Sequence, residues 1–268
     1  MPVPGLLSPA GAGLRGAAGG GPRRGGGLAH AELPGAIGGG GGGLAQPIPV
    51  AEGRMTRVYL IRHGQTTWNA ERRYQGRKDA PLTELGRSQM RRLAAALASE
   101  PVRAVYTSPL GRCRWGAERI AAQHGLEPVV EPDLVELDHG ILDGLRVDEM
   151  EEHVGRLVRR WWEDPAGVHL PGGETLEQAR TRAYGAFRRI VQRHPGETVV
   201  VVAHGGVNKL ILLTLLQAPL DSYFRIQQHN GAVNLVEVPP EGSPRIVAIN
   251  DTCYLRLPSQ DPGVVGQE

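Results

Sequence analysis

The sequence is short of cysteine, of long hydrophobic runs and of net charge, and each shortage excludes a class of protein. Its two cysteines, Cys113 and Cys253, stand in no CxxC or zinc-finger spacing, so they predict neither a disulfide framework nor a metal site. No run of 18 apolar residues is present, which excludes a membrane-spanning helix. A net charge of +2 argues against a dedicated nucleic-acid-binding protein. We therefore expect a cytoplasmic protein in a reducing compartment, without a metal or other cofactor.

The first fifty residues differ in composition from the rest. They hold 17 of the 38 glycines, including the run Gly38–Gly43, which no Gly-Lys-Ser/Thr follows and which is therefore no P-loop. Such a segment buries too little apolar area to offset its backbone entropy, so we predict disorder at residues 1–53 and in the tail 258–268. Three arginines precede the first acidic residue, Glu32, and leave a targeting segment open. The alternatives are a flexible extension or a true start at Met55.

Residues 54–257 predict one domain in which strands alternate with helices. This alternation favours a three-layer α/β/α sandwich around a mostly parallel sheet. Thr83 is a plausible N-cap, with Leu85 and Leu97 among the apolar positions of the helix after it, and Thr175 and Gln178 have the spacing of a capping box. The predicted strands span 56–62, 102–108 and 197–206. The predicted helices span 82–100, 110–124, 148–162, 172–194 and 207–217, and a hairpin spans 232–251.

Polar residues follow each of the three predicted parallel strands. They are Arg62-His63-Gly64 after the first, Ser108 leading to Arg112 after the second, and His204-Gly205-Gly206 after the third. Ligands of such sheets collect beyond the carboxyl ends of the strands. Two strands therefore deliver a His-Gly pair to the same edge, which predicts a site there.

These residue types suit chemistry at phosphorus. A neutral imidazole is nucleophilic near pH 7 because its pKa is about 6.5, provided that the backbone holds its other ring nitrogen. The planar fork of arginine matches two phosphoryl oxygens, so Arg62, Arg112 and a protonated His204 could form a cationic cage. Basic residues also outnumber acidic ones in residues 54–120, which suits an anionic substrate.

Six motifs in a fixed order resemble the histidine phosphatase superfamily, the phosphoglycerate mutase-like proteins. They are LIRHGQTTWN, LTELGRSQ, TSPLGRCRWGAERIA, VELDHGILDGL, PGGETLEQARTR and VVAHGGV, and together they cover about residues 55–220. The form SPLGR resembles the phosphatase branch, which includes the α-ribazole phosphatases and the broad-specificity phosphatases.

The resemblance implies a role for each matching residue. His63 would be the nucleophile that becomes phosphohistidine, and Glu136 would be the acid/base that protonates the leaving oxygen and then activates water. The phosphoryl group would be held by Arg62, Arg112, His204, Asn69 and the backbone of Gly205. Gln75 and Gly76, with Trp68, would either touch the substrate or serve in packing. The scheme requires no metal.

The sequence departs from the family pattern around the acid. Phosphatase relatives often carry an aromatic residue, Trp and Glu where this chain has His139, Leu142 and Asp143. The helix after SPLGR also carries Cys113 and Trp115 at places where small residues and threonine are usual. These changes keep the residues of the phosphate cage intact and alter the residues around it.

We therefore expect a metal-independent phosphomonoesterase of the histidine acid phosphatase type that acts on a small phosphorylated metabolite. The alternatives are a phosphoglycerate mutase and a non-catalytic phospholigand-binding protein of the same fold. The pocket rim is expected from residues 68–78 and 140–171, and the hairpin near 232–249 could provide an edge for a homodimer.

Overall fold

The computed structural model describes residues 55–256, apart from the side chains of residues 151 and 153. The segments predicted to be disordered, 1–53 and 258–268, lie outside the described residues. The strands are β1 (Thr56–Arg62), β2 (Val102–Thr107), β3 (Val129–Val130), β4 (Thr198–Ala203), β5 (Val233–Val238) and β6 (Arg245–Asp251). The helices are α1 (Thr67–Ala70), α2 (Glu84–Leu97), α3 (Gly111–Ala122), α4 (Val147–Glu163), α5 (Leu176–Arg193) and α6 (Gly205–Leu215).

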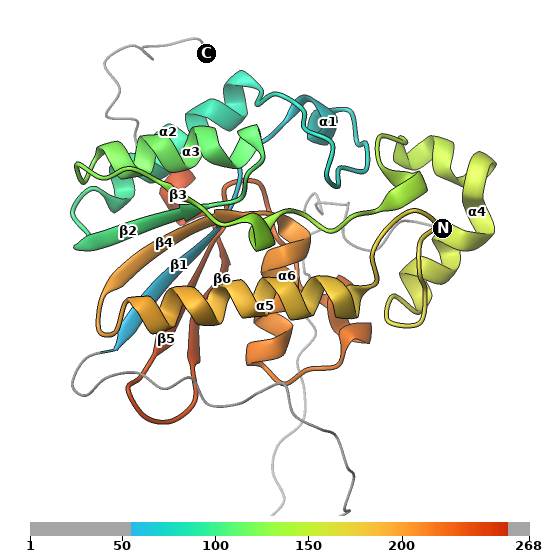
Figure 1. Ribbon diagram of the computed structural model, residues 1–268. Coiled ribbons are helices and arrows are strands. Elements are labelled where there is room, and N and C mark those ends of the chain that lie inside the picture. The colour runs from blue at the N-terminus through green and yellow to red at the C-terminus, as the bar shows by residue number, and fades with distance from the viewer. Residues whose placement is uncertain (1–54, 257–268) are drawn as a thin grey trace, which may run out of the picture. The chain divides into compact units, whose positions relative to one another are not determined.

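The strands form one twisted sheet in the order β3-β2-β4-β1-β5-β6 (Figure 1). β3, β2, β4 and β1 are parallel, whereas β5 and β6 run antiparallel at one edge. The mostly parallel sheet and the closing hairpin are therefore as predicted. β1 and β4 are adjacent, with Arg62 opposite Ala203, so the two chain segments that leave these strands start side by side.

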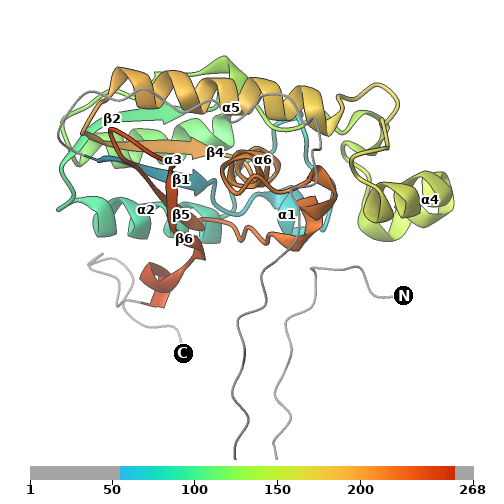
Figure 2. The ribbon, with the colours of Figure 1, turned by 90° about the horizontal axis from the view of Figure 1, so that it is seen from below.

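Helices cover both faces of the sheet, which confirms the three-layer α/β/α sandwich (Figure 2). β4 shows how the layers share its side chains: Val199 and Val201 pack with α5 and α6, whereas Val200 and Val202 pack with α2 and α3. Successive side chains of a strand point to opposite faces, so a central strand with helices on both sides is apolar at every position. All six residues of β4 are buried.

The helix starts follow the predicted capping chemistry. The Thr83 hydroxyl accepts the Gly86 N–H at 3.0 Å, and Thr175 and Gln178 form the predicted capping box of α5. Leu85, one of the apolar positions expected on or near one face of α2, is 55% exposed. Gly86 is buried instead, because the backbone after β1 packs against this first turn too closely for a side chain.

Two glycines permit that close approach. A Cβ on Gly64 would lie 2.3 Å from the Gly86 carbonyl oxygen, and a Cβ on Gly86 would lie 2.0 Å from the Gln65 carbonyl oxygen. No real side chain tolerates such contacts, so only glycine fits at either place. The start of α2 thereby holds the segment that follows His63.

The helix α4 lies beyond the edge at which the parallel strands end, away from both helical layers (Figures 1 and 2). It is kinked at Val154, whose φ of −144° and ψ of 24° are not helical. Its buried residues Val158 and Trp161 belong to a third apolar cluster, which also includes Leu142 and Tyr223. This cluster joins α4 to the last turns of α6 and builds one wall of the pocket described below. Among the described residues, no helix has the length and apolar character needed to cross a bilayer.

Candidate active site

The two histidines of the His-Gly pairs meet at the carboxyl ends of β1 and β4. The His63 N–H donates to the Ala203 carbonyl at 3.1 Å, which continues the ladder between these strands by one residue. The two imidazole rings lie edge to face, with centroids 5.3 Å apart. The expectation that both pairs reach one edge of the sheet is thus met in the structure, and the reason is the parallel pairing of the two strands.

His63 is held as a neutral imidazole with one nitrogen available. Its Nδ1 lies 2.8 Å from the Gly64 carbonyl oxygen, so Nδ1–H donates there and the lone pair remains on Nε2. Burial, and then the guanidinium groups of Arg112 and Arg62, lower the pKa of His63 well below 6.5. A nucleophile needs this protonation state, and the backbone supplies it as the sequence suggested.

The surroundings of His204 disfavour its charged form, so its protonation in a phosphate cage stays a prediction. Its Nδ1 accepts the Arg112 Nε–H at 3.3 Å, and its Nε2 donates to the Ser108 hydroxyl at 2.7 Å. Burial, Arg112 and His63 lower the pKa of His204 well below 6.5, because a further cation here would face like charges in a desolvated site. A bound phosphate would favour its protonation by adding negative charge nearby.

Arg112 lies behind His204, and its side chain is completely buried. Its guanidinium donates to the carbonyl oxygens of Gly76 at 2.6 Å and Lys78 at 2.8 Å, and it forms an ion pair with Asp79 at 3.1 Å. Asp79 also accepts the N–H of Gly111 at 2.6 Å, so it holds its own loop against the first turn of α3, which carries Arg112. Gly76 does not itself line the pocket, and its backbone hydrogen bonds are with Arg112 and Asp143.

Arg62, Asn69, Gln75 and Gly205 all line the pocket in front of His63. Arg62 donates to the Gln228 carbonyl at 2.5 Å, while its buried Nε has no hydrogen-bond partner within the described chain. The Gln75 side chain accepts from the Thr66 hydroxyl at 2.7 Å, and its buried amide nitrogen likewise lacks a described partner. Buried unpaired donors are costly, so those of Arg62 and Gln75 suit a ligand rich in acceptors.

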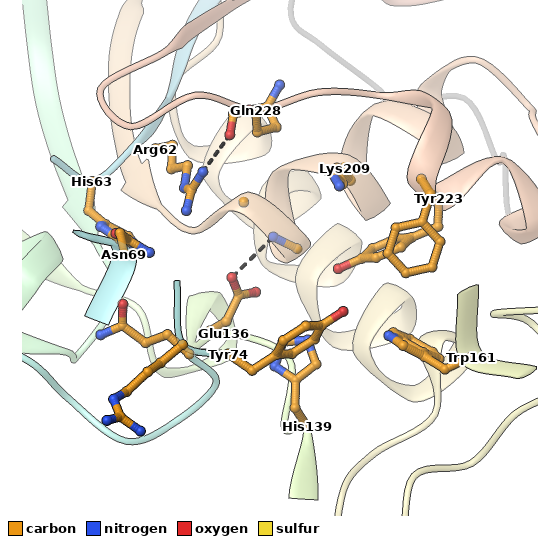
Figure 3. Close-up of a pocket in the computed structure, with 15 residues that line it drawn as sticks. Arg62, His63, Asn69, Tyr74, Glu136, His139, Trp161, Lys209, Tyr223 and Gln228 are labelled. Carbon is orange, nitrogen blue, oxygen red and sulfur yellow. Dashed lines mark hydrogen bonds between the residues drawn. The ribbon is translucent and has the colours of Figure 1, made fainter. Parts of the chain in front are cut away.

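Glu136 lies at the N-terminal end of α6, on the other side of the pocket from His63 (Figure 3). One carboxylate oxygen accepts from Leu137 N at 2.8 Å and Val207 N at 3.1 Å, and the other accepts from Gly206 N at 3.1 Å. A Cβ on Gly206 would lie 2.5 Å from the nearer oxygen, so glycine is required for this approach. The first turn of a helix favours a negative group at this place.

Arg182 of α5 fixes the segment that carries Glu136. Its guanidinium donates to the carbonyl oxygens of Asp133, Val135 and Glu136, at 2.8, 2.5 and 3.1 Å, and forms an ion pair with Glu174. Sequence reasoning missed this role, although Glu174 and Arg182 both lie within the motif PGGETLEQARTR. An arginine that holds the carbonyl oxygens of three nearby residues leaves no trace in hydrophobic periodicity.

The predicted rim agrees with the structure only in part. Residues 68–78 contribute Asn69, Arg73, Tyr74 and Gln75, and Trp161 comes from the predicted second region, but Trp68 packs against Gly144 away from the pocket. The residues that the rim prediction missed come from chain segments outside both ranges. They are His139, Lys209, Tyr223, Phe224 and Gln228.

The pocket has a volume of about 210 Å³ and contains a single carboxylate, that of Glu136. Pockets that enclose drug-sized ligands measure roughly 300–1,000 Å³, so this one suits a small metabolite. Asp143, where relatives carry Glu, accepts the N–H groups of Gly76 at 2.7 Å and Lys78 at 3.1 Å, and thereby closes the loop that holds Arg112. Within residues 55–256, no group of three or more potential metal-ligating side chains is gathered in one place.

The two buried histidines make stability depend on pH. The pKa of each histidine is lowered in the folded protein. Below about pH 6.5 the unfolded chain therefore binds more protons than the folded chain does. The free energy of unfolding has its full value above pH 6.5. Below pH 6.5 it decreases by up to about 1.4 kcal/mol per pH unit for each histidine. Urea unfolding at pH 7.5 and 5.5 measures this loss. His63→Ala should lose less free energy of unfolding between these two pH values than the wild-type protein does. An equal loss in both proteins would contradict a lowered pKa for His63.

A comparison with protein-family models identifies the class of protein. The model of the histidine phosphatase superfamily, branch 1, matches residues 58–252. The chain therefore belongs to this family, as its six motifs predicted.

Particular relatives include both a phosphatase and a mutase. Phosphoserine phosphatase 1 of Hydrogenobacter thermophilus is 34% identical over 201 residues, which cover 75% of this chain and 95% of that protein. Probable phosphoglycerate mutase GpmB of Cronobacter sakazakii is 34% identical over 183 residues, which cover 68% and 85%. Among solved structures, YhfR of Bacillus stearothermophilus has a TM-score of 0.71 at 33% identity, covering 75% of this chain and 99% of that one. The α-ribazole phosphatase of Shigella flexneri shares the fold, with a TM-score of 0.67 at 22% identity, covering 73% and 96%.

Proposed function

We propose that this protein is a phosphomonoester hydrolase that works through a phosphohistidine on His63. The observation that carries the proposal is the protonation and the position of the His63 side chain. Its Nδ1–H is bound to the Gly64 carbonyl, its pKa is lowered by burial and by two arginines, and it lines a pocket whose other side carries Glu136. A neutral nucleophile, a cationic surround and one carboxylate are the groups that phosphoryl transfer to water needs.

Each group then has one task. The Nε2 of His63 attacks phosphorus, and the bond from phosphorus to the ester oxygen breaks as Glu136 protonates that oxygen. Glu136, now ionised, takes a proton from water, whose oxygen attacks phosphohistidine and releases phosphate and neutral His63. Arg62, with Asn69 and the N–H of Gly205, holds the phosphoryl oxygens. Arg112 carries positive charge behind them, and the bound phosphate favours protonation of His204.

We extend the proposal to the conditions and the assembly of the enzyme. The reaction above uses side chains alone, so we propose metal independence and a histidine acid phosphatase type of mechanism. The substrate is a small phosphate ester, with no nucleic acid or membrane partner, and the enzyme acts in the cytoplasm. A homodimer could form through the edge strand β6, where Val247 and Ile249 are exposed.

Phosphate release in the presence of a metal chelator tests the proposal. The panel of substrates contains 3-phosphoglycerate, L-phosphoserine, glycerol 3-phosphate and p-nitrophenyl phosphate. We expect release from at least one ester, unchanged by the chelator. Conversion of 3-phosphoglycerate to its 2-isomer without release would instead establish the mutase, an outcome that the similarity to GpmB makes worth measuring. Binding of phosphate without either reaction would leave a phospholigand-binding protein.

A further inference from the structure

The segment 228–231 lies shortly before β5 and outside all six motifs that resemble the family. It nevertheless makes hydrogen bonds to three residues on one side of the pocket, which are Arg62, His63 and Asn69. The bond to His63 runs from the Gly231 N–H to the His63 carbonyl oxygen at 3.0 Å, so the segment is fixed beside the end of β1. The other two bonds involve side chains that have donors to offer a phosphoryl group.

One of these bonds orients the guanidinium of Arg62. Its Nη1 donates to the Gln228 carbonyl oxygen at 2.5 Å, as the dashed line in Figure 3 shows. The Nε of Arg62 is buried and has no hydrogen-bond partner within the described chain. The guanidinium is a rigid plane, so a bond at Nη1 limits where its Nε and Nη2 donors can point. The place of the Gln228 carbonyl therefore decides how well those donors meet a phosphoryl group in front of His63.

The Gln228 carbonyl is held in turn by a buried pair of side-chain amides. The Gln228 amide nitrogen donates to Asn234 Oδ1 at 2.8 Å, and the Asn234 amide nitrogen donates to Gln228 Oε1 at 2.8 Å. Backbone groups fix the orientation of Asn234, because its nitrogen donates to the Leu60 carbonyl and its oxygen accepts the Asn250 N–H, both at 2.9 Å. Asn234 is completely buried and Gln228 nearly so. A satisfied buried network of this kind makes the residues that it joins rigid.

A second bond from the segment orients the side-chain amide of Asn69. The Oδ1 of Asn69 accepts the N–H of Thr66 at 3.1 Å and the amide NH2 of Asn230 at 2.9 Å. A backbone N–H can only donate, so the Asn69 atom that faces Thr66 is its oxygen. The NH2 group of Asn69 makes no hydrogen bond within residues 55–256 and is left for a ligand in the pocket that Asn69 lines.

We propose that residues 228–231 are a positioning segment, in which Gln228 aims the donors of Arg62 at the phosphoryl oxygens and Asn230 aims the NH2 group of Asn69. The inference rests on the proposed function, which gives Arg62 and Asn69 the task of holding those oxygens. Asn230 does not line the pocket, and Gln228, which does, has its carbonyl and its amide engaged with other residues. Both therefore act through their neighbours, where a displacement of about 1 Å can lower a rate roughly 100-fold.

Gln228→Met tests the first half of the proposal. The variant removes the amide pair but keeps the length of the side chain and the backbone carbonyl, and Asn234 keeps its two backbone partners. It should raise the Kd of orthovanadate, measured by calorimetry, about 5- to 50-fold, and lower kcat/KM for p-nitrophenyl phosphate by a similar factor. Gln227→Met is the matched control, because it makes the same substitution on the exposed neighbouring residue. It should change neither value by more than about twofold.

A double-mutant cycle with Arg62→Lys shows whether Gln228 acts through Arg62. Lysine keeps the positive charge but has no planar fork for Gln228 to aim. In the Arg62→Lys protein, Gln228→Met should therefore weaken vanadate binding by less than about twofold. An equal loss in both backgrounds would overturn the proposal, because Gln228 would then stabilise the pocket without orienting Arg62.

Asn230→Leu tests the second half in the same way. It should weaken vanadate binding about 3- to 10-fold in the wild-type background and by less than about twofold when Asn69→Ala is also present. Asn230→Leu and Gln228→Met together should have multiplicative effects, because each residue orients a different donor. A loss that persists without the Asn69 amide would overturn the role of Asn230.

Vanadate binding is measured without turnover, so this proposal and the proposed function fail separately. Coupled losses of binding in a protein that releases no phosphate from any ester would support the positioning segment and contradict the hydrolase. Phosphate release with an unchanged kcat/KM and vanadate affinity in Gln228→Met would overturn the segment alone. A wild-type protein that binds no vanadate would contradict both.

Discussion

His63→Ala should lower kcat/KM for phosphate release by about 10⁴-fold or more. The variant loses the atom that forms the bond to phosphorus. The other imidazole that lines the pocket, His139, is packed against the rings of Tyr74 and Trp161. When a catalytic nucleophile that works together with other catalytic groups is removed from an enzyme, the rate decreases by a factor of this size. The fold should persist at a cost of about 1–3 kcal/mol, since the His63 side chain makes only one hydrogen bond, to its neighbour Gly64.

The control is His124→Ala. His124 lies just beyond the end of α3, and Arg112 lies at the start of that helix. His124→Ala therefore makes the same substitution one helix length away from the active site. Steady-state kinetics on both variants, with near-ultraviolet circular dichroism to check the fold, provide the measurement. His63→Asn serves as a second variant that leaves a smaller cavity. Turnover by folded His63→Ala above about one per cent of the wild-type rate would remove His63 from the nucleophilic role.

Glu136→Gln should lower kcat/KM for alkyl phosphates by about 10² to 10⁴-fold. An alkoxide is a poor leaving group and needs the proton that Glu136 supplies, whereas p-nitrophenolate leaves without one. The loss should therefore be much smaller for the first step with p-nitrophenyl phosphate. The phosphohistidine should then accumulate, because the amide cannot activate water. Rapid-mixing kinetics should show a burst of p-nitrophenol followed by a slow steady state.

The structure also predicts a stability cost for this variant. The new amide NH2 would face the N–H of Gly206, or the N–H groups of Leu137 and Val207, and two donors cannot satisfy each other. A cost of about 1–3 kcal/mol is expected for an unsatisfied buried donor. Glu118→Gln on the exposed side of α3 is the matched control. An equal loss for alkyl and aryl esters, with no burst, would show that Glu136 positions other groups and does not transfer the proton.

The positions of Arg62, His63 and His204 could be predicted because each lies one or two residues from a strand that the sequence marks clearly. The run TVVVVA is apolar at every position, as expected for a strand between two layers, and the segment before Arg62 is similar. Parallel strands end at the same edge, so the chain order of motifs was enough to bring the two histidines together. The location of Glu136 relied on the family resemblance, since no strand or helix leads directly into it.

The exposure of Leu85 and the surroundings of His204 could not be predicted in this way. Leu85 follows the apolar pattern of its helix, but the segment after His63 occupies the buried side of that first turn. Burial disfavours the charged form of His204, and so does Arg112, whose Nε–H reaches its Nδ1 from another helix. Both facts depend on neighbours distant in the sequence, which periodicity does not report.

The sequence by itself determined the family, the layered α/β/α order and the pair of histidines at the sheet edge, because these follow from local hydrophobic patterns and short motifs. Only the tertiary structure decided that Lys209 and Tyr223 share the far end of the pocket, and that three backbone N–H groups hold Glu136. These placements depend on how α4, α6 and the segment at Tyr223 pack into one apolar cluster. Such packing is a sum of contacts between distant residues, so it exists only once the chain has folded.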